Sequence, residues 1–200
     1  KPILDKAKAI KVDWPGKPPK PAWNWWEPKE DELVVQWRTR PIVLDLNDDG
    51  LNDLIVIDHE GYLSYFERIK KNNQLILKPG KSIFFDTDGN LLHTNERQAG
   101  KSGRRKIDLV DWDNDGDFDL LINTINTGLF SNNGENENFA FKDKGNLTSV
   151  ILGGHSTSPT TVDWNKDNVP DLLIGAEDGF FYYLPRDSWH NMQGSEKIKK

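Results

Sequence analysis

The stretch DWDNDGDFDL, residues 111–120, places five aspartates within ten residues. Carboxylates this close together repel one another unless a positive charge lies among them. Two further stretches follow the same pattern, DLNDDGLNDL at 45–54 and DWNKDNVPDL at 163–172. Each copy has Asp at position 1, Asn or Asp at position 3, Asp at position 5, and Asp-Leu at positions 9 and 10. Three matched copies favour a common ligand over a chance excess of aspartate in surface turns.

The oxygen-rich spacing of these loops predicts calcium as that ligand. Calcium takes roughly six to eight hard oxygen ligands, and the EF-hand loop supplies them from positions 1, 3 and 5 and from a backbone carbonyl at position 7. The predicted carbonyl ligands are those of Leu51, Asp117 and Val169. The predicted side-chain ligands are Asp45, Asn47, Asp49 and Asp53 in the first loop, Asp111, Asp113, Asp115 and Asp119 in the second, and Asp163, Asn165, Asp167 and Asp171 in the third.

Position 6 of each loop must turn the chain sharply. Gly50 and Gly116 occupy it in the first two loops, and Asn168 replaces glycine in the third. Asparagine tolerates the left-handed backbone conformation better than most residues with a side chain. We therefore expect the third loop to keep the same turn.

Short apolar runs flank every loop. PIVLD (41–45), KIDLVD (106–111) and PTTVD (159–163) precede the loops, and DLIVID, DLLIN and DLLIG follow them. The runs are rich in Ile, Val, Leu, Phe and Tyr and are bounded by Gly, Asn and Asp, which is typical of strands and hairpins, with no convincing helical period. Each unit is predicted to be a strand, an acidic loop, a strand, a tight turn and a strand. The units recur about every 50 to 65 residues, as propeller blades do.

From residue 41 to residue 186 the chain resembles the FG-GAP or VCBS repeats, the integrin-alpha type of β-propeller. The resemblance rests on the three acidic loops, each with its following Asp-Leu strand. It implies an all-β fold of four-stranded antiparallel blades, with calcium loops between the first and second strands. The blades are expected at about 41–95, 104–145 and 157–186, after an N-terminal Pro- and Trp-rich connecting segment with a strand (1–40) and before a C-terminal tail (187–200).

Three blades are fewer than the roughly four to eight of closed propellers. We therefore expect the remaining blades to come from the rest of a longer chain or from a second chain.

Composition restricts the partners. The net charge of −6 and the pI of about 5.3 argue against a nucleic-acid partner. No stretch approaches the roughly 20 apolar residues of a membrane span, so none is expected. The absence of cysteine excludes disulfides. Calcium loops of this quality suit millimolar calcium, which predicts an extracytoplasmic location: secreted, periplasmic or on the cell surface.

Blade topology places the segments that enter each first strand, together with the second-to-third-strand turns, on the face opposite the loops. Arginine is suited to gripping a carboxylate or sulfate, histidine to moving a proton, and an aromatic ring to stacking on a sugar. For each residue of these types on this face, the alternative is a structural role, either in an ion pair within the fold or in hydrogen bonds to the backbone of a loop. The predicted catalytic residues are His59, His155, Arg104 and Arg105, and the predicted substrate-binding residues are Arg38, Arg40, Trp37, Tyr62 and Thr157.

Three functions fit this inventory. The first is an enzyme that acts on uronate-containing, anionic polysaccharide, since propellers with similar calcium loops occur among pectin-backbone lyases. In such a β-elimination an arginine or a metal neutralises the uronate carboxylate, and a histidine or a tyrosine takes the proton from the ring carbon C5. A hydrolase would instead need two carboxylates, for which Glu60 and Glu177 are the candidates. The others are a non-catalytic carbohydrate- or protein-binding propeller and a structural module attached to a separate catalytic domain.

Overall fold

A computed structural model describes residues 7–20, 26–36, 38–94, 105–134, 139–153 and 157–186. Within these residues the fold is all-β, as predicted, and no helix is long and apolar enough to cross a membrane. The strands are β1 (Ile42–Leu44), β2 (Asp53–Ile57), β3 (Leu63–Phe66), β4 (Arg68–Lys71), β5 (Gln74–Leu77), β6 (Phe84–Asp86), β7 (Ile107–Val110), β8 (Asp119–Asn123), β9 (Thr127–Asn132), β10 (Phe139–Asn146), β11 (Ser158–Val162), β12 (Asp171–Gly175) and β13 (Phe181–Leu184).

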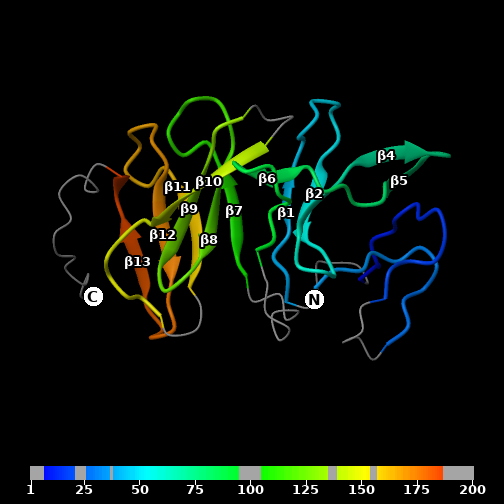
Figure 1. Ribbon diagram of the computed structural model, residues 1–200, viewed down its shortest axis with the longest axis horizontal. Coiled ribbons are helices and arrows are strands. Elements are labelled where there is room, and N and C mark those ends of the chain that lie inside the picture. Colours follow the sequence, from blue (N-terminus) through cyan, green and yellow to red (C-terminus); the bar gives the residue numbers. More distant parts are fainter. Residues whose placement is uncertain are drawn as a thin grey trace, which may run out of the picture.

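Three sheets follow one another across the molecule, each containing one copy of the repeat (Figure 1). Repeat sheet 1 has the order β1-β2-β3, repeat sheet 2 the order β6-β10-β9-β8-β7, and repeat sheet 3 the order β11-β12-β13. All ladders are antiparallel except the one between β6 and β10, which is parallel. Four strands per blade are therefore not confirmed. Beyond β3 the described residues add only isolated bridges to repeat sheet 1, and β6 pairs with the outer strand of repeat sheet 2 instead.

Side chains that alternate along each middle strand form the cores between sheets. In β2, Ile55 and Ile57 belong to a core shared with Ile107, Leu120 and their neighbours in repeat sheet 2. In the same way, Leu121 of β8 packs in a second core with Leu172 and Ile174 of β12. Successive residues of a strand point to opposite faces, so an apolar run without alternation fills both faces of a sheet.

The N-terminal segment and the β4–β5 hairpin cover the outer face of repeat sheet 1. Leu54 and Val56, the alternate residues of β2, pack there against Val12, Phe66 and Leu77. The segment is tied to the hairpin by backbone hydrogen bonds from Asp13 to Leu77 (2.8 Å) and from Leu77 to Lys11 (3.0 Å). An isolated bridge between Val12 and Leu77 thus joins the segment to the hairpin, and its described residues form no ladder strand.

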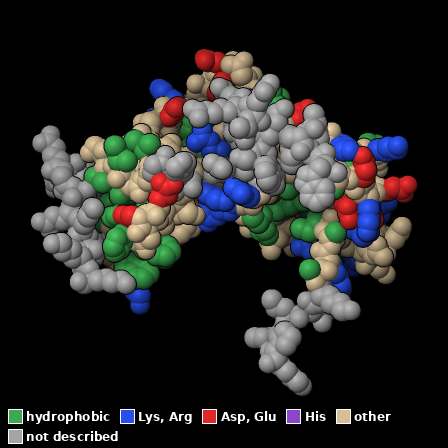
Figure 2. Space-filling model, turned by 90° about the horizontal axis from the view of Figure 1, so that it is seen from below, with side chains coloured by type: hydrophobic (Ala, Val, Ile, Leu, Met, Phe, Trp, Pro, Cys, Tyr) green, Lys and Arg blue, Asp and Glu red, His purple; other side chains and the backbone are tan. Residues whose placement is uncertain are grey.

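The three acidic loops lie at one edge of the molecule, at the top of Figure 1, because each connects the first and second strands of its sheet. We call this the loop edge. Figure 2 is turned to look from below, onto the opposite edge, where Lys and Arg side chains gather near the middle and the molecule is hollowed.

Candidate metal centres and the opposite edge

Each acidic loop is closed by its own first aspartate. The two carboxylate oxygens of Asp45 accept hydrogen bonds from the backbone N–H groups of Asp49 (3.1 Å) and Gly50 (2.8 Å). Asp111 binds the equivalent groups of the second loop and Asp163 those of the third, at 3.0 to 3.2 Å. The same arrangement thus recurs in all three copies.

The turn at position 6 is left-handed in all three loops. Gly50 and Gly116 have φ of 84° and 97°, and Asn168 has φ of 66°, so asparagine takes over the role of glycine as the sequence predicts. A second left-handed residue stands at position 4, which the sequence analysis did not anticipate. These residues are Asp48, Asn114 and Lys166, with φ between 56° and 64°.

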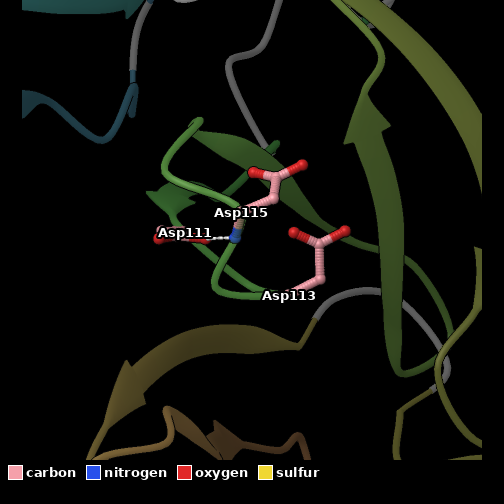
Figure 3. A group of neighbouring side chains, drawn as sticks. All are labelled: Asp111, Asp113 and Asp115. Atoms are coloured by element: carbon pink, nitrogen blue, oxygen red, sulfur yellow. Dashed lines mark hydrogen bonds between the residues drawn. The ribbon is translucent and has the colours of Figure 1, made fainter.

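The side chains at positions 1, 3 and 5 come together in the second loop, where all three are carboxylates. In the second loop Asp111, Asp113 and Asp115 each place an oxygen within 4.8 Å of the others, and Asp113 and Asp115 are exposed (Figure 3). In the third loop Asn165 accepts from the backbone of Asp167 (3.0 Å) and donates to its carboxylate (2.8 Å). An all-oxygen set at this spacing matches the chemistry of a calcium site, so the loop residues fit that ion.

The aspartates at position 9 are buried. Asp119 accepts from the backbone N–H of Trp112 (3.1 Å) and from that of Asn132 (2.8 Å), and thereby ties its loop to the end of β9. Burial raises the pKa of Asp119 above its ordinary value. Asp53 and Asp171 make the same pair of backbone contacts and each also accepts a tyrosine hydroxyl. These hydrogen bonds give the position-9 aspartates a structural role. Calcium ligation at position 9 stays a prediction.

At the opposite edge, one arginine joins the three repeat sheets. Arg40, just before β1, donates to the carbonyl of Pro159 (2.6 Å) and to the hydroxyl of Thr160 (3.3 Å). Its guanidinium lies 3.9 Å from the carboxylate of Asp108, which itself accepts from Thr160 (3.0 Å). Sequence reasoning missed Asp108, whose only signal is a charge within the apolar run KIDLVD.

Three further cations lie on the same side. Lys106 donates to the carbonyl of Arg38 (3.1 Å), and Arg105 donates to the carbonyls of Thr94 (3.0 Å) and Asn123 (2.9 Å). Arg38 holds φ of 64°, a conformation uncommon for a long side chain. We call Arg38, Arg40, Arg105 and Lys106 the cationic cluster.

A cleft of about 560 Å³ opens beside Arg105, between residues 92–94 and repeat sheet 2. Its apolar lining includes Leu92, Ile122 and Phe130, and its polar lining includes His93, Thr94, Arg105, Thr124, Asp143 and Asn146. The ring of Tyr62 stacks on that of His93 at 4.4 Å between centroids. Two of the predicted residues thus lie at the cleft. Arg105 lines it, and Tyr62 stacks on His93, which lines it as well.

The remaining predicted residues are dispersed. His59 lies in the turn after β2, where the neighbouring Asp58 accepts from the backbone of Glu60 and Gly61. Thr157 is buried and donates to the carbonyl of Asn126. Trp37, Arg104 and His155 lie outside the described residues. The roles assigned to all of these residues stay predictions.

Comparison with known proteins bears on the repeat itself. Residues 111–174 match the family model described as an FG-GAP-like repeat, which confirms the predicted resemblance. The matched segment runs from the first aspartate of the second loop to Ile174 of β12, and so contains two of the three acidic loops. No curated protein and no solved structure matches the chain.

Proposed function

We propose that this protein is a calcium-stabilised, propeller-like binding module that holds a carboxylate-bearing carbohydrate at its cationic cluster. The observation that carries the proposal is the separation of charge between two edges. Carboxylates converge at the loop edge, and arginine and lysine gather at the opposite edge. The two edges would therefore take different ligands, a cation at one and an anion at the other.

The loop edge would hold calcium through oxygens that the backbone already directs. Bound calcium would supply positive charge that removes the repulsion among the aspartates of each loop. Backbone N–H donors direct the carboxylate of the position-1 aspartate, as at Asp45, so its side chain needs little further ordering to bind the ion. Sites of this kind suit millimolar calcium, which favours an extracytoplasmic setting.

The opposite edge would hold the carbohydrate. Guanidinium groups recognise carboxylates through paired hydrogen bonds, and Arg38 and Arg40 come from one segment while Arg105 comes from another. The neighbouring cleft combines apolar side chains with His93, Thr94 and Asn146, a mixture that suits the apolar and hydroxyl surfaces of a sugar ring. A uronate-containing polysaccharide offers both the carboxylate and the ring.

The experiment compares two single substitutions that are matched in conformation and charge. Arg38 in the cationic cluster and Lys166 at the loop edge both have φ of 64°, so glycine fits each position without strain and each change removes one positive charge. Binding to polygalacturonate, measured by isothermal titration calorimetry with calcium present, should weaken about fivefold in Arg38→Gly because one ion-pair partner is lost. Lys166→Gly should bind like the parent protein.

Equal weakening by both substitutions would show that only net charge matters and would overturn the assigned site. Absence of binding to polygalacturonate and to other uronate polymers, with calcium bound, would overturn the carbohydrate function. The same mixtures also test the enzymatic alternative. An increase in ultraviolet absorbance, from an unsaturated uronate product, would assign lyase chemistry to this edge. His59 and Arg105 would then be the described residues to substitute first.

A further inference from the structure

The cleft beside repeat sheet 2 brings a histidine and an arginine close together. Thr94, the residue after His93, donates its backbone N–H to the carbonyl of Gly61 (3.2 Å) and accepts a hydrogen bond from Nε of Arg105 (3.0 Å). Both His93 and Arg105 line the cleft. One backbone segment thus fixes the histidine to the turn before β3 and holds the arginine beside it.

Two further contacts orient the ring of His93. Tyr62 stacks on it, with 4.4 Å between the ring centroids and 25° between the ring planes, and an isolated bridge pairs the two backbones. Nε2 of His93 lies 3.1 Å from the carbonyl oxygen of Glu60. A carbonyl oxygen only accepts hydrogen bonds, so Nε2 carries a proton whether the ring is neutral or charged. Within the described residues, Nδ1 is the polar ring atom that these contacts leave for a ligand.

The hydrogen-bonding role of Nδ1 changes when the ring gains a proton. In the neutral ring Nδ1 is an acceptor, which suits a sugar hydroxyl, and in the charged ring it is a donor, which suits a carboxylate. Histidine is the side chain that ordinarily makes this change between about pH 5 and pH 8. A carboxylate ligand stays ionised over that range, so it favours the charged ring.

The charged groups of the surrounding elements act on the ring in both directions. Among the described residues, Glu60 contributes a negative charge from the turn before β3, Asp143 contributes one from β10, and Arg105 contributes a positive charge from the segment before β7. Asp58 is bonded to the backbone of its own turn, and Lys106 to a carbonyl outside the cleft. The two carboxylates favour the charged ring and the arginine opposes it. A bound carboxylate would offset the arginine and tip this balance toward protonation.

We propose that His93 is a proton-dependent contact for the carboxylate of the carbohydrate, which it binds together with Arg105. This inference rests on the proposed function and adds the residue that makes binding depend on pH. The ring takes up a proton as the acidic carbohydrate binds, so affinity rises as the pH falls through the range in which histidine titrates. A neutral sugar has no carboxylate and gains nothing from the charged ring.

The experiment measures the affinity for polygalacturonate by isothermal titration calorimetry between about pH 7.5 and about pH 5.5, the range in which histidine changes charge, at a constant free calcium concentration. The parent protein should bind about fivefold more tightly at the acidic end, which is the effect of one added ion pair. Titrations near the middle of the range, in two buffers with different heats of ionisation, should show uptake of a fraction of a proton.

Two substitutions of His93 represent its neutral and charged forms. His93→Gln keeps a donor for the Glu60 carbonyl but carries no charge, so its affinity should change by less than about twofold over the same range and its binding should take up no proton. The chain has four histidines, and this variant leaves the other three in place to reveal their contribution. His93→Lys is charged throughout and, at the neutral end of the range, should bind as tightly as the parent does at the acidic end.

An equal rise in affinity in the parent and in His93→Gln would assign the pH dependence to other groups and overturn the role of His93. A parent affinity that does not change with pH would overturn it as well. Failure of the proposed function looks different, because neither the parent nor His93→Lys would then bind polygalacturonate at any pH. In that case His93 has no carboxylate to contact, and the inference fails with the function.

Discussion

The loop edge and the opposite edge are built from contacts of very different range. In each acidic loop the backbone of position 5 binds the first aspartate, four residues away, and the pattern recurs in three copies. At the opposite edge Arg40 donates to Pro159 and Thr160, which lie 119 and 120 positions further along the chain. Thr160 in turn donates to Asp108, 52 positions away. Hydrogen bonds within a loop recur wherever the sequence motif recurs, whereas the contacts of Arg40 join three different sheets at a single place. A substitution at the loop edge should therefore affect one repeat, whereas a substitution at the opposite edge should affect how the three sheets pack together.

The largest expected effect separates the two kinds of aspartate within one loop. Asp119→Ala removes the acceptor of two buried backbone N–H groups, those of Trp112 and Asn132, and should lower the free energy of unfolding by about 3 kcal/mol. Asp113→Ala, at an exposed position, should have little effect when calcium is absent. Urea denaturation with chelator present measures both. Equal losses would show that Asp113 also has a structural role without metal.

Loss of calcium from a single loop should give the next largest effect. Binding to the folded state alone stabilises it by about 2.7 kcal/mol per site when free calcium is 100 times the dissociation constant. Asp115→Ala should remove the contribution of the second loop and leave those of the first and third. Thermal melts with calcium and with chelator measure the difference. An unchanged melting temperature in the parent protein would contradict calcium binding at the loop edge.

A smaller effect is expected where the sheets meet. Arg40→Ala removes charged hydrogen bonds to Pro159 and Thr160 and should lower the free energy of unfolding by about 1 to 2 kcal/mol. Hydrogen exchange should rise in β11, on the partner side of the contact. Arg38→Gly is the matched control, since it removes a neighbouring arginine at a position that glycine tolerates. Faster exchange in β1 alone would argue against a link between sheets.

The smallest effect concerns Asp108 and depends on pH. Burial raises the pKa of Asp108, with Arg40 and the Thr160 hydroxyl opposing that shift. The folded state therefore holds the proton more tightly than the unfolded chain does. This contribution to stability is present below the ordinary pKa of the carboxyl and is lost as pH rises through the raised value.

Asp108→Asn should remove that dependence. The melting temperature of the variant relative to the parent should rise from acidic to neutral pH, with the amide oxygen still accepting from Thr160 and Thr161. Melts across this range with chelator present measure the difference. A difference that falls with rising pH would mean that the ion pair with Arg40 outweighs burial.

Much of the local structure could be predicted from residue spacing. The strands around each loop appear within a residue or two of the apolar runs, and Asn168 adopts the left-handed turn expected of it. The role of Asp119 was harder to foresee. As an acidic residue at position 9 it resembles a ligand, and only its burial against Asn132, 13 residues away, reveals the structural bond.

The sequence alone determined the acidic loops, the strands beside them and the turn between, because their hydrogen bonds and their two-residue alternation involve near neighbours. Which faces are covered depends instead on how the sheets pack on one another. Trp112 and Trp164 stand at the same motif position, yet one is buried by the next sheet and the other is exposed. The parallel pairing of β6 with β10 and the contacts of Arg40 were likewise invisible in the sequence. Such contacts depend on how distant segments are brought together by packing, and no local pattern records that.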